Sequence, residues 1–212
     1  MDSDTTTRIG DHARLLSQFE ASGDVLVGTQ MVAKGLDFPT VTLVGVVAAD
    51  TGLHIADFRA AERTFGLIAQ VCGRSGRSQP GEAIVQTYSP THPAIVSAAL
   101  HDYEGFATRE LQDRRALGYP PAKRLVYLGI IGRNRSETWG VATALASLLG
   151  ERVPGELLGP APYPIARLND EWRFRIALKT AEPARTRRAL REHVLPFAQR
   201  ERHARIAINV DP

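Results

Sequence analysis

The sequence predicts an α/β protein made of two successive units: an open parallel sheet with helices, then a small α+β domain. Three observations support this fold class. Short apolar runs alternate with helical segments over residues 1–92, which is the pattern of parallel strands joined by helices. A glycine and two prolines within 118–121 mark a boundary. Beyond it, the elements follow the β-α-β-β-α-β order of a ferredoxin-like domain.

The first unit is expected to contain two helices and three strands. We predict a helix over 11–22 and a buried parallel strand over 24–28, whose residues are DVLVG. The apolar runs 41–48 and 82–88 are predicted to be the other strands. Residues 57–72 carry apolar side chains at helical spacing and are predicted to form the second helix.

The chain is expected to divide into three parts. Residues 1–92 form the first domain, the polar and helical residues 93–117 form a connector, and residues 118–212 form the second domain. The predicted elements of the second domain are strands at 123–131, 171–179 and 204–210, and helices at 136–149 and 183–199. Residues 155–164 are a stretch rich in glycine and proline.

Two elements of the second domain have a clear inward face. Ser136 is expected to cap the helix that it starts, and the inward residues of that helix are Trp139, Ala142, Leu145 and Leu149. The strand over 171–179 alternates, so Trp172, Phe174, Ile176 and Leu178 face the core. The opposite face of this strand carries Arg173, Arg175 and Lys179.

Composition narrows the class of protein. The chain has 212 residues and one cysteine, Cys72, which excludes a disulfide framework and a cysteine-based zinc site. No metal site is expected. No apolar run is long enough for a membrane span, and the acidic N-terminus does not resemble a signal peptide. We expect a cytoplasmic protein with no membrane partner.

Charge is unevenly distributed between the two parts of the chain. The net charge is −4 over residues 1–117 and +7 over residues 118–212. A basic half suggests a polyanionic partner such as nucleic acid, and a solvated basic surface is an equally good reading of charge alone.

The first motif with chemical content is GTQMVAKGLDFP, over residues 28–39. It begins where a predicted buried strand ends, and ligands of open α/β sheets bind outside the carboxyl ends of strands. Thr29 and Gln30 can donate to a phosphate, Lys34 adds a cation, and Asp37 could accept from a ribose hydroxyl. The segment is not a P-loop, because the residues on either side of Lys34 are wrong for that motif.

The second motif is QVCGRSGR, over residues 70–77. It ends a predicted helix and enters a glycine-rich turn. Arg74 and Arg77 are suited to the γ-phosphate in phosphoryl transfer, because a guanidinium stabilises the negative charge that develops there. Gln70 could sense the phosphate or the attacking water. A helix that ends in a flexible basic turn is the structural alternative.

Together these motifs resemble motifs V and VI of superfamily 2 helicases. The intervening ADTGLHIADFRAAERTFGLIAQ, the lead-in DSDTT and the later RRALGYPP narrow the resemblance to the PriA (primosomal protein N′) family of replication-restart DNA helicases. The resemblance covers nearly the whole chain, as the C-terminal portion of such a protein. It implies that the first domain is most of the second RecA-like helicase lobe.

The resemblance also implies roles for single residues. Arg74 and Arg77 would be arginine fingers with Gln70 beside them, Gly35 and Asp37 would line the nucleotide cleft, and Thr29 would touch a DNA phosphate. The ATP phosphates and Mg²⁺ are held by the first lobe in this family, and zinc by a cysteine-rich insertion. Neither a GxxxxGK[ST] nor a DExH motif occurs in the 212 residues, so we expect the chain alone not to hydrolyse ATP.

For the second domain the resemblance implies contacts with branched or single-stranded DNA, single-stranded DNA-binding protein and other primosome proteins. The charge of the domain agrees with contacts to DNA phosphates. The candidate residues on a strand face and a helix are Arg173, Arg175, Lys179, Arg187, Arg188 and Arg191. Part of this set could instead be solvated or paired with Glu182 and Glu192. The leading hypothesis is a portion of an ATP-dependent 3′–5′ helicase that recognises stalled forks, and the alternatives are a non-catalytic DNA- or protein-binding adaptor and another superfamily 2 translocase.

Overall fold

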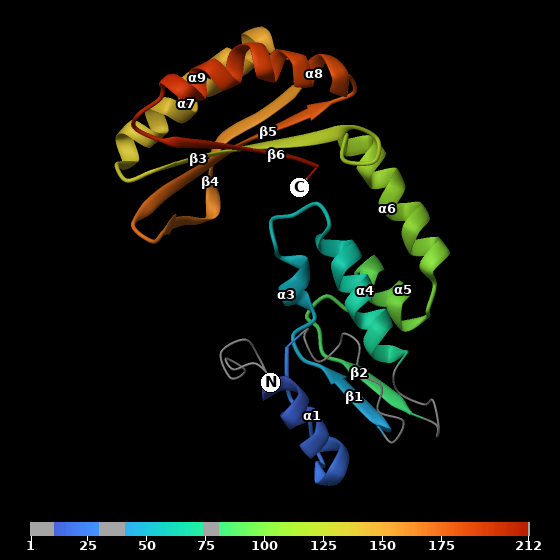
Figure 1. Ribbon diagram of the computed structural model, residues 1–212. Helices are drawn as coiled ribbons and strands as arrows, with labels where there is room; N and C mark the ends of the chain where they lie inside the picture. Colours follow the sequence, from blue (N-terminus) through green and yellow to red (C-terminus); the bar gives the residue numbers. More distant parts are fainter. Residues whose placement is uncertain (1–10, 30–40, 74–80, 212) are drawn as a thin grey trace. The chain divides into compact units, whose positions relative to one another are not determined.

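The computed structural model describes residues 11–29, 41–73 and 81–211 (Figure 1). The chain folds as two compact units, one ending at Thr108 and the other starting at Arg109. This division falls inside helix α6 (Tyr103–Leu117), within the predicted connector. The two units are therefore described separately.

The first unit contains a parallel pair of strands, β1 (Leu43–Val46) and β2 (Glu82–Val85), within the runs 41–48 and 82–88 predicted to be strands. Leu43 pairs with Glu82 and Val46 with Val85. The helices of this unit are α1 (Asp11–Ser22), α3 (Asp50–Leu53), α4 (Ala60–Cys72) and α5 (Pro93–Ala99). The predicted helices at 11–22 and 57–72 are confirmed as α1 and α4.

The core of the first unit lies between α4, α5 and the start of α6. Ile68 is fully buried, and the rings of Phe65 and Phe106 stack with centroids 4.3 Å apart. Ala94 and Ala98 on α5 are also fully buried, and their small side chains let α4 and α5 approach closely. Burial of these apolar surfaces is what holds the short helices in place.

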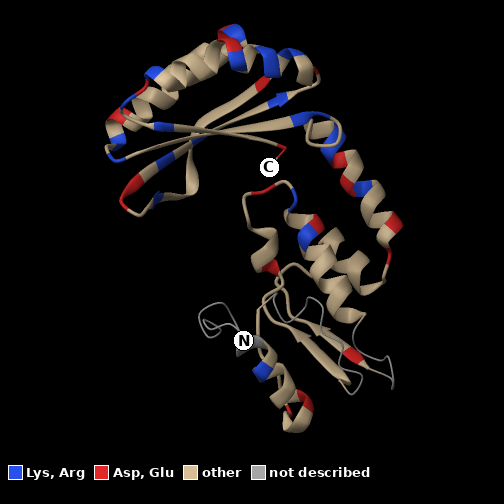
Figure 2. Ribbon diagram, viewed as in Figure 1, with Lys and Arg blue, Asp and Glu red and all other residues tan. Residues whose placement is uncertain are grey.

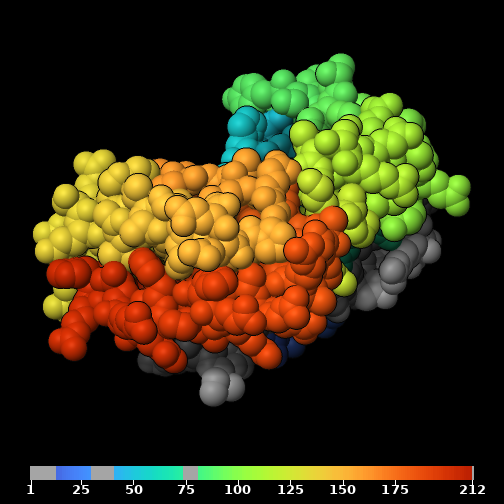
Figure 3. All heavy atoms as spheres, turned by 90° about the horizontal axis from the view of Figure 1, so that it is seen from above, coloured from blue at the N-terminus to red at the C-terminus, as the bar shows by residue number. Residues whose placement is uncertain are grey.

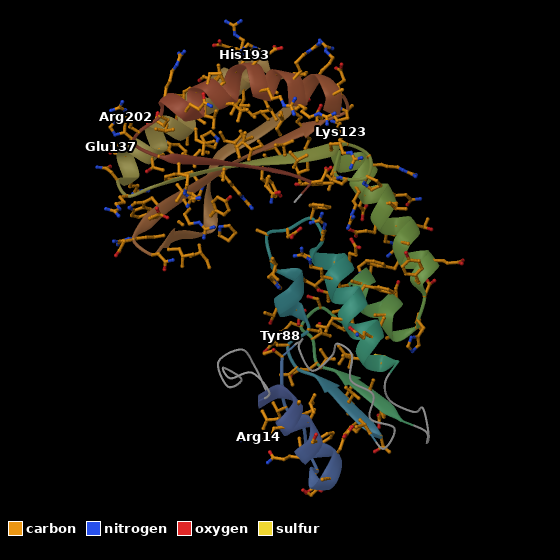
Figure 4. All side chains as sticks on the ribbon, in the orientation of Figure 1. Arg14, Tyr88, Lys123, Glu137, His193 and Arg202 are labelled. Carbon is orange, nitrogen blue, oxygen red and sulfur yellow. The ribbon has the colours of Figure 1, made fainter. Side chains whose placement is uncertain are left out.

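A carboxylate joins the two chain segments that follow β1 and β2. Asp50, at the start of α3, accepts hydrogen bonds from Thr87 Oγ1 and from the Tyr88 amide, both at 2.8 Å. The Tyr88 amide is the main cause of the lowered pKa of Asp50, because it stabilises the ionised form. Asp50 itself is buried, whereas the Tyr88 side chain is exposed (Figure 4).

One prediction for the first unit is wrong. Residues 24–28 do not form a buried strand, and the side chains of Val25 and Val27 are 78% and 74% exposed. An apolar run becomes a buried strand only when neighbouring strands provide hydrogen bonds and cover its faces. Within the described residues, the sheet of this unit is the β1–β2 pair alone, and it does not include this run.

The second unit has a four-stranded antiparallel sheet with helices on one face (Figure 1). The spatial order of the strands is β4-β5-β3-β6. After the end of α6, its elements are β3 (Arg124–Gly132), α7 (Arg135–Arg152), β4 (Glu156–Leu168), β5 (Glu171–Thr180), α8 (Pro183–Ala189), the π-helical turn η1 (Leu190–Val194), α9 (Leu195–Arg200) and β6 (Arg205–Val210). The predicted β-α-β-β-α-β element order is present.

The core of the second unit lies between the sheet and its helices. Leu128 on β3 and Ile176 on β5 are fully buried, and they pack with Leu145 and Leu149 of α7 in one cluster. Val194 of η1 is buried in the same cluster. Seen from above, α7 and the α8–α9 segment cover this side of the unit (Figure 3).

Three details differ from the sequence-based expectations. The cap of α7 is Asn134 and not Ser136, because Asn134 Oδ1 accepts from the amides of Ser136 and Glu137. Trp139 is 42% exposed, although its ring packs edge-on against Phe174. The glycine- and proline-rich stretch forms most of β4, where an edge position and two register shifts accommodate the prolines.

Candidate nucleic-acid interface

Most residues assigned to the helicase motifs lie outside the described part of the chain. This applies to Gln30, Lys34, Gly35, Asp37, Arg74 and Arg77. Thr29 is described and exposed, and Gln70 is half-buried in the last turn of α4. The geometry of the candidate interface comes from the second unit.

The sheet of the second unit has a face on the side away from α7, α8, η1 and α9, called here the helix-free face, and the end of α6 reaches this face at Lys179. Phe174 and Ile176 of β5 point into the core, so the alternate residues Arg173 and Arg175 point to this helix-free face. Arg175 lies opposite Gly129 of the neighbouring strand β3. The predicted alternation of β5 is therefore confirmed, and it places both arginines on one surface.

Two tyrosines share this surface with the arginines. The Arg173 guanidinium lies 4.6 Å from the centroid of the Tyr163 ring. The Arg175 guanidinium lies 5.9 Å from the same ring and 5.7 Å from the centroid of Tyr127. The four side chains alternate between cation and aromatic ring, an arrangement in which each cation is attracted to the negative face of a ring.

A glycine makes this arrangement possible. Tyr163 is on β4, and its hydroxyl reaches across β5 to Gly129 on β3, where an added Cβ would lie only 2.8 Å from the hydroxyl oxygen. Any larger residue at position 129 would push the ring away. The absence of a side chain at Gly129 thus gives the hydroxyl end of Tyr163 its place on the helix-free face.

The arginines of this face keep their charge available. Among the described residues, neither Arg173 nor Arg175 makes an ion pair. Arg205 of β6 approaches Glu171 only at 3.7 Å, with both side chains exposed in part. Arg173 and Arg175 are partly exposed, and a guanidinium without an ion pair can bind phosphate without first breaking an internal salt bridge.

Lys179 differs from the other predicted phosphate ligands. It is buried, and its Nζ donates to the Leu117 carbonyl at 2.8 Å and to Glu156 Oε1 at 3.4 Å. The ammonium also lies 4.2 Å from the centroid of the Tyr119 ring. Its charge is therefore used inside the unit, and we do not place Lys179 in the interface.

Glu156 is held between two lysines. Its carboxylate accepts from Lys123 Nζ at 3.2 Å, beside the Lys179 ammonium. The hydrogen bond from Lys123, followed by the charge of Lys179, lowers the pKa of Glu156 below its ordinary value. These residues and Thr180 line a depression in the surface. The charges of the two lysines are paired there with the Glu156 carboxylate.

A second basic surface lies on the helical side of the same unit. Arg187, Arg188 and Arg191 of α8 and η1 are exposed and make no ion pair with a described residue. Arg185 pairs with Glu182 at 2.7 Å. Figure 2 shows basic residues on the strands and on the helices of this unit. Because β5 and these helices belong to different faces of the unit, the structure separates the predicted basic set into two surfaces.

Sequence reasoning missed the two tyrosines. Tyr127 lies in a predicted strand and could have been placed on its outward face by alternation alone. No sequence pattern indicated Tyr163, because the neighbouring prolines do not predict a strand there. Only the register shifts of β4 bring its hydroxyl to Gly129.

Within residues 11–29, 41–73 and 81–211, no three histidine, cysteine or carboxylate side chains gather to hold a metal ion. No helix in these ranges is long and apolar enough to cross a membrane.

The chain is similar to proteins of known family. Residues 115–212 match the family model described as the primosomal protein N C-terminal domain. Replication restart protein PriA of Bacillus subtilis is 43% identical over 219 residues, covering 100% of this chain and 27% of that protein. PriA of Synechocystis is 47% identical over 182 residues, covering 84% of this chain and 22% of that protein, and PriA of Chlamydia pneumoniae is 39% identical, covering 100% and 29%.

These matches first define the second unit as a C-terminal domain of the primosomal protein N type. The chain as a whole belongs to the PriA family and corresponds to the C-terminal part of its members. It spans less than a third of the length of these curated relatives.

Proposed function

We propose that the chain serves replication restart as the C-terminal part of an ATP-dependent 3′–5′ DNA helicase that recognises stalled or branched forks and initiates primosome assembly. Its own contribution is to bind DNA through the second unit. The observation that carries this proposal is the set of exposed, unpaired arginines on a unit that matches the PriA C-terminal domain. The proposed partners are DNA, single-stranded DNA-binding protein and other primosome proteins.

The first unit is proposed to be part of the second RecA-like lobe, and the second unit to be ferredoxin-like. The parallel β1–β2 pair supports the first assignment, and the β4-β5-β3-β6 order supports the second. In this proposal Arg74 and Arg77, with Gln70, act on the γ-phosphate of ATP, and Gly35 and Asp37 line the nucleotide cleft. Thr29, Gln30 and Lys34 are proposed to contact DNA phosphates.

Binding of forked DNA by the purified chain over a salt series tests the role of the second unit. We expect Arg187→Ala, Arg188→Ala and Arg191→Ala together to weaken binding and to flatten its salt dependence. Each lost phosphate contact changes the slope of log K against log salt by roughly 0.9. The matched control is Arg152→Ala, Arg200→Ala and Arg202→Ala, which removes the same charge from other exposed positions of the unit.

Equal loss in the test and control variants would contradict a specific α8–η1 surface, because general charge would then explain both. ATP turnover is measured in parallel, with and without forked DNA. We expect no turnover by this chain, since it contains no P-loop motif. DNA binding without turnover is also the result expected of a non-catalytic adaptor, and DNA-stimulated turnover would exclude the adaptor.

A further inference from the structure

We propose that the helix-free face of the second unit is a stacking platform for unpaired DNA bases, centred on Tyr163, Arg173 and Arg175. This inference rests on the proposed DNA binding by this unit. It adds the surface that would recognise unpaired bases and the way in which it would hold them.

The first argument is the order of planar groups across the face. Arg173, Tyr163, Arg175 and Tyr127 follow one another, with centroid distances of 4.6, 5.9 and 5.7 Å between successive neighbours. They come from three adjacent strands, so the sheet fixes their spacing. Aromatic rings and guanidinium planes are the groups on which proteins stack unpaired bases.

The second argument is that small residues lie beside Arg175 and Tyr163, whereas Ile131 of β3 lies opposite Arg173. Gly129 lies beneath Tyr163, and the adjacent positions on the same face are Ala177 of β5 and Ala207 of β6. Ala207 is exposed, as are its neighbours on this side of β6, Arg205 and Asn209. The four planar groups are themselves partly exposed, and the short side chains at these positions leave space beside them for a flat ligand.

The third argument is charge. Arg173 and Arg175 make no ion pair with a described residue, so they can bind the phosphates that accompany the bases. Glu171, at the start of the same strand, lies 3.7 Å from the Arg205 guanidinium. The face therefore combines a positive field with stacking groups, as surfaces for single-stranded nucleic acid do.

These features favour a single strand over a duplex. In a duplex the faces of the bases are covered by their neighbours, and only the groove edges and phosphates are available to a protein. A sheet face that carries aromatic rings does not enter a groove as an inserted helix does. Stacking on Tyr163 and the arginines needs bases whose faces are free.

The test uses the whole chain with a fluorescein-labelled oligothymidine strand and with a blunt duplex of equal length. We expect Tyr163→Ala to weaken single-strand binding about tenfold, in line with the loss of one base–aromatic stack. Tyr163→Phe keeps the ring and should bind within about twofold of the wild type. Arg175→Ala should weaken single-strand binding more than Arg200→Ala, which removes one exposed arginine elsewhere on the unit.

Stacking itself is followed with a single strand that contains 2-aminopurine. Its fluorescence should be quenched on binding by the wild type and Tyr163→Phe, and much less by Tyr163→Ala. The platform is ruled out if Tyr163→Ala binds the single strand as the wild type does, or loses single strand and duplex equally. If the α8–η1 triple variant alone loses binding, the proposed function stands and the platform falls. If the wild type binds no DNA, both fall.

Discussion

Lys179 and Glu156 lie opposite each other in the β4–β5 pair, and the lysine Nζ is 3.4 Å from the Glu156 carboxylate although Lys179 is only 5% exposed. The same ammonium donates to the carbonyl of Leu117 at the end of α6. One buried cation therefore connects the last turn of a helix to two strands. A positive charge alone does not show that a residue binds nucleic acid. The ammonium of Lys179 is buried with three partners and stabilises the fold instead.

Lys179→Met should lower the free energy of unfolding of the second unit by about 2 kcal/mol. The substitution leaves the Leu117 carbonyl without its donor and the carboxylate without one of its two cations. Urea unfolding followed by tryptophan fluorescence measures this unit specifically, since Trp139 and Trp172 both belong to it. Lys123→Met, at a more exposed position, should cost less. Weaker DNA binding by Lys179→Met at unchanged stability would contradict the structural role.

Glu156 makes the stability of this unit depend on pH. Its folded pKa is lowered by Lys123 and Lys179, so its contribution is present above the ordinary value of 4.5 and is lost as the pH falls through the lowered pKa. In Glu156→Gln the urea midpoint should fall less steeply than in the wild type between about pH 5 and about pH 3. Glu192→Gln is the control, at an exposed glutamate that makes no ion pair with a described residue. Identical pH profiles for wild type and Glu156→Gln would refute this assignment.

Asn134→Ala should destabilise the second unit by about 1 kcal/mol, the usual cost of losing a helix N-cap. The side chain accepts from the amides of Ser136 and Glu137, at 2.9 and 3.3 Å. Ser136→Ala removes the residue that the sequence suggested as cap, and it should change the unfolding free energy by less than about 0.5 kcal/mol. The reverse ranking of the two variants in urea unfolding would restore Ser136 as the cap.

Leu145→Ala should cost about 3 kcal/mol, because a fully buried leucine leaves a cavity when it is shortened. The same change at Leu148, one turn along α7 and only partly buried against the same core, should cost roughly 1 kcal/mol. Equal losses at the two positions would mean that α7 does not present Leu145 to the sheet.

Much of the fold was predictable because its elements have strong local patterns. The alternation over 171–179 became β5, with Phe174 and Ile176 buried as expected. Helical spacing predicted α4, and Ile68 on it is fully buried. The failure at 24–28 has a physical reason: whether an apolar run becomes a strand depends on partners that its own residues do not specify.

The candidate interface was predictable only in part. Alternation placed Arg173 and Arg175 on the outward face of a strand, and that needed no knowledge of neighbouring strands. Their relation to Tyr163 could not be foreseen, because the ring arrives from an edge strand through register shifts and rests on Gly129. The burial of Lys179 depends on Leu117, 62 residues earlier in the chain.

By itself the sequence determined the family, the order of the elements and which positions of each element are apolar, because these depend on residue types and their local spacing. Only the tertiary structure decided which charges remain available for a ligand. Lys179 and Arg175 lie on the same face of β5, and the sequence pattern does not distinguish between them. Folding encloses the first among Leu117, Tyr119 and Glu156 and leaves the second beside two rings, because side-chain partners come from distant segments that meet only when the sheet is assembled.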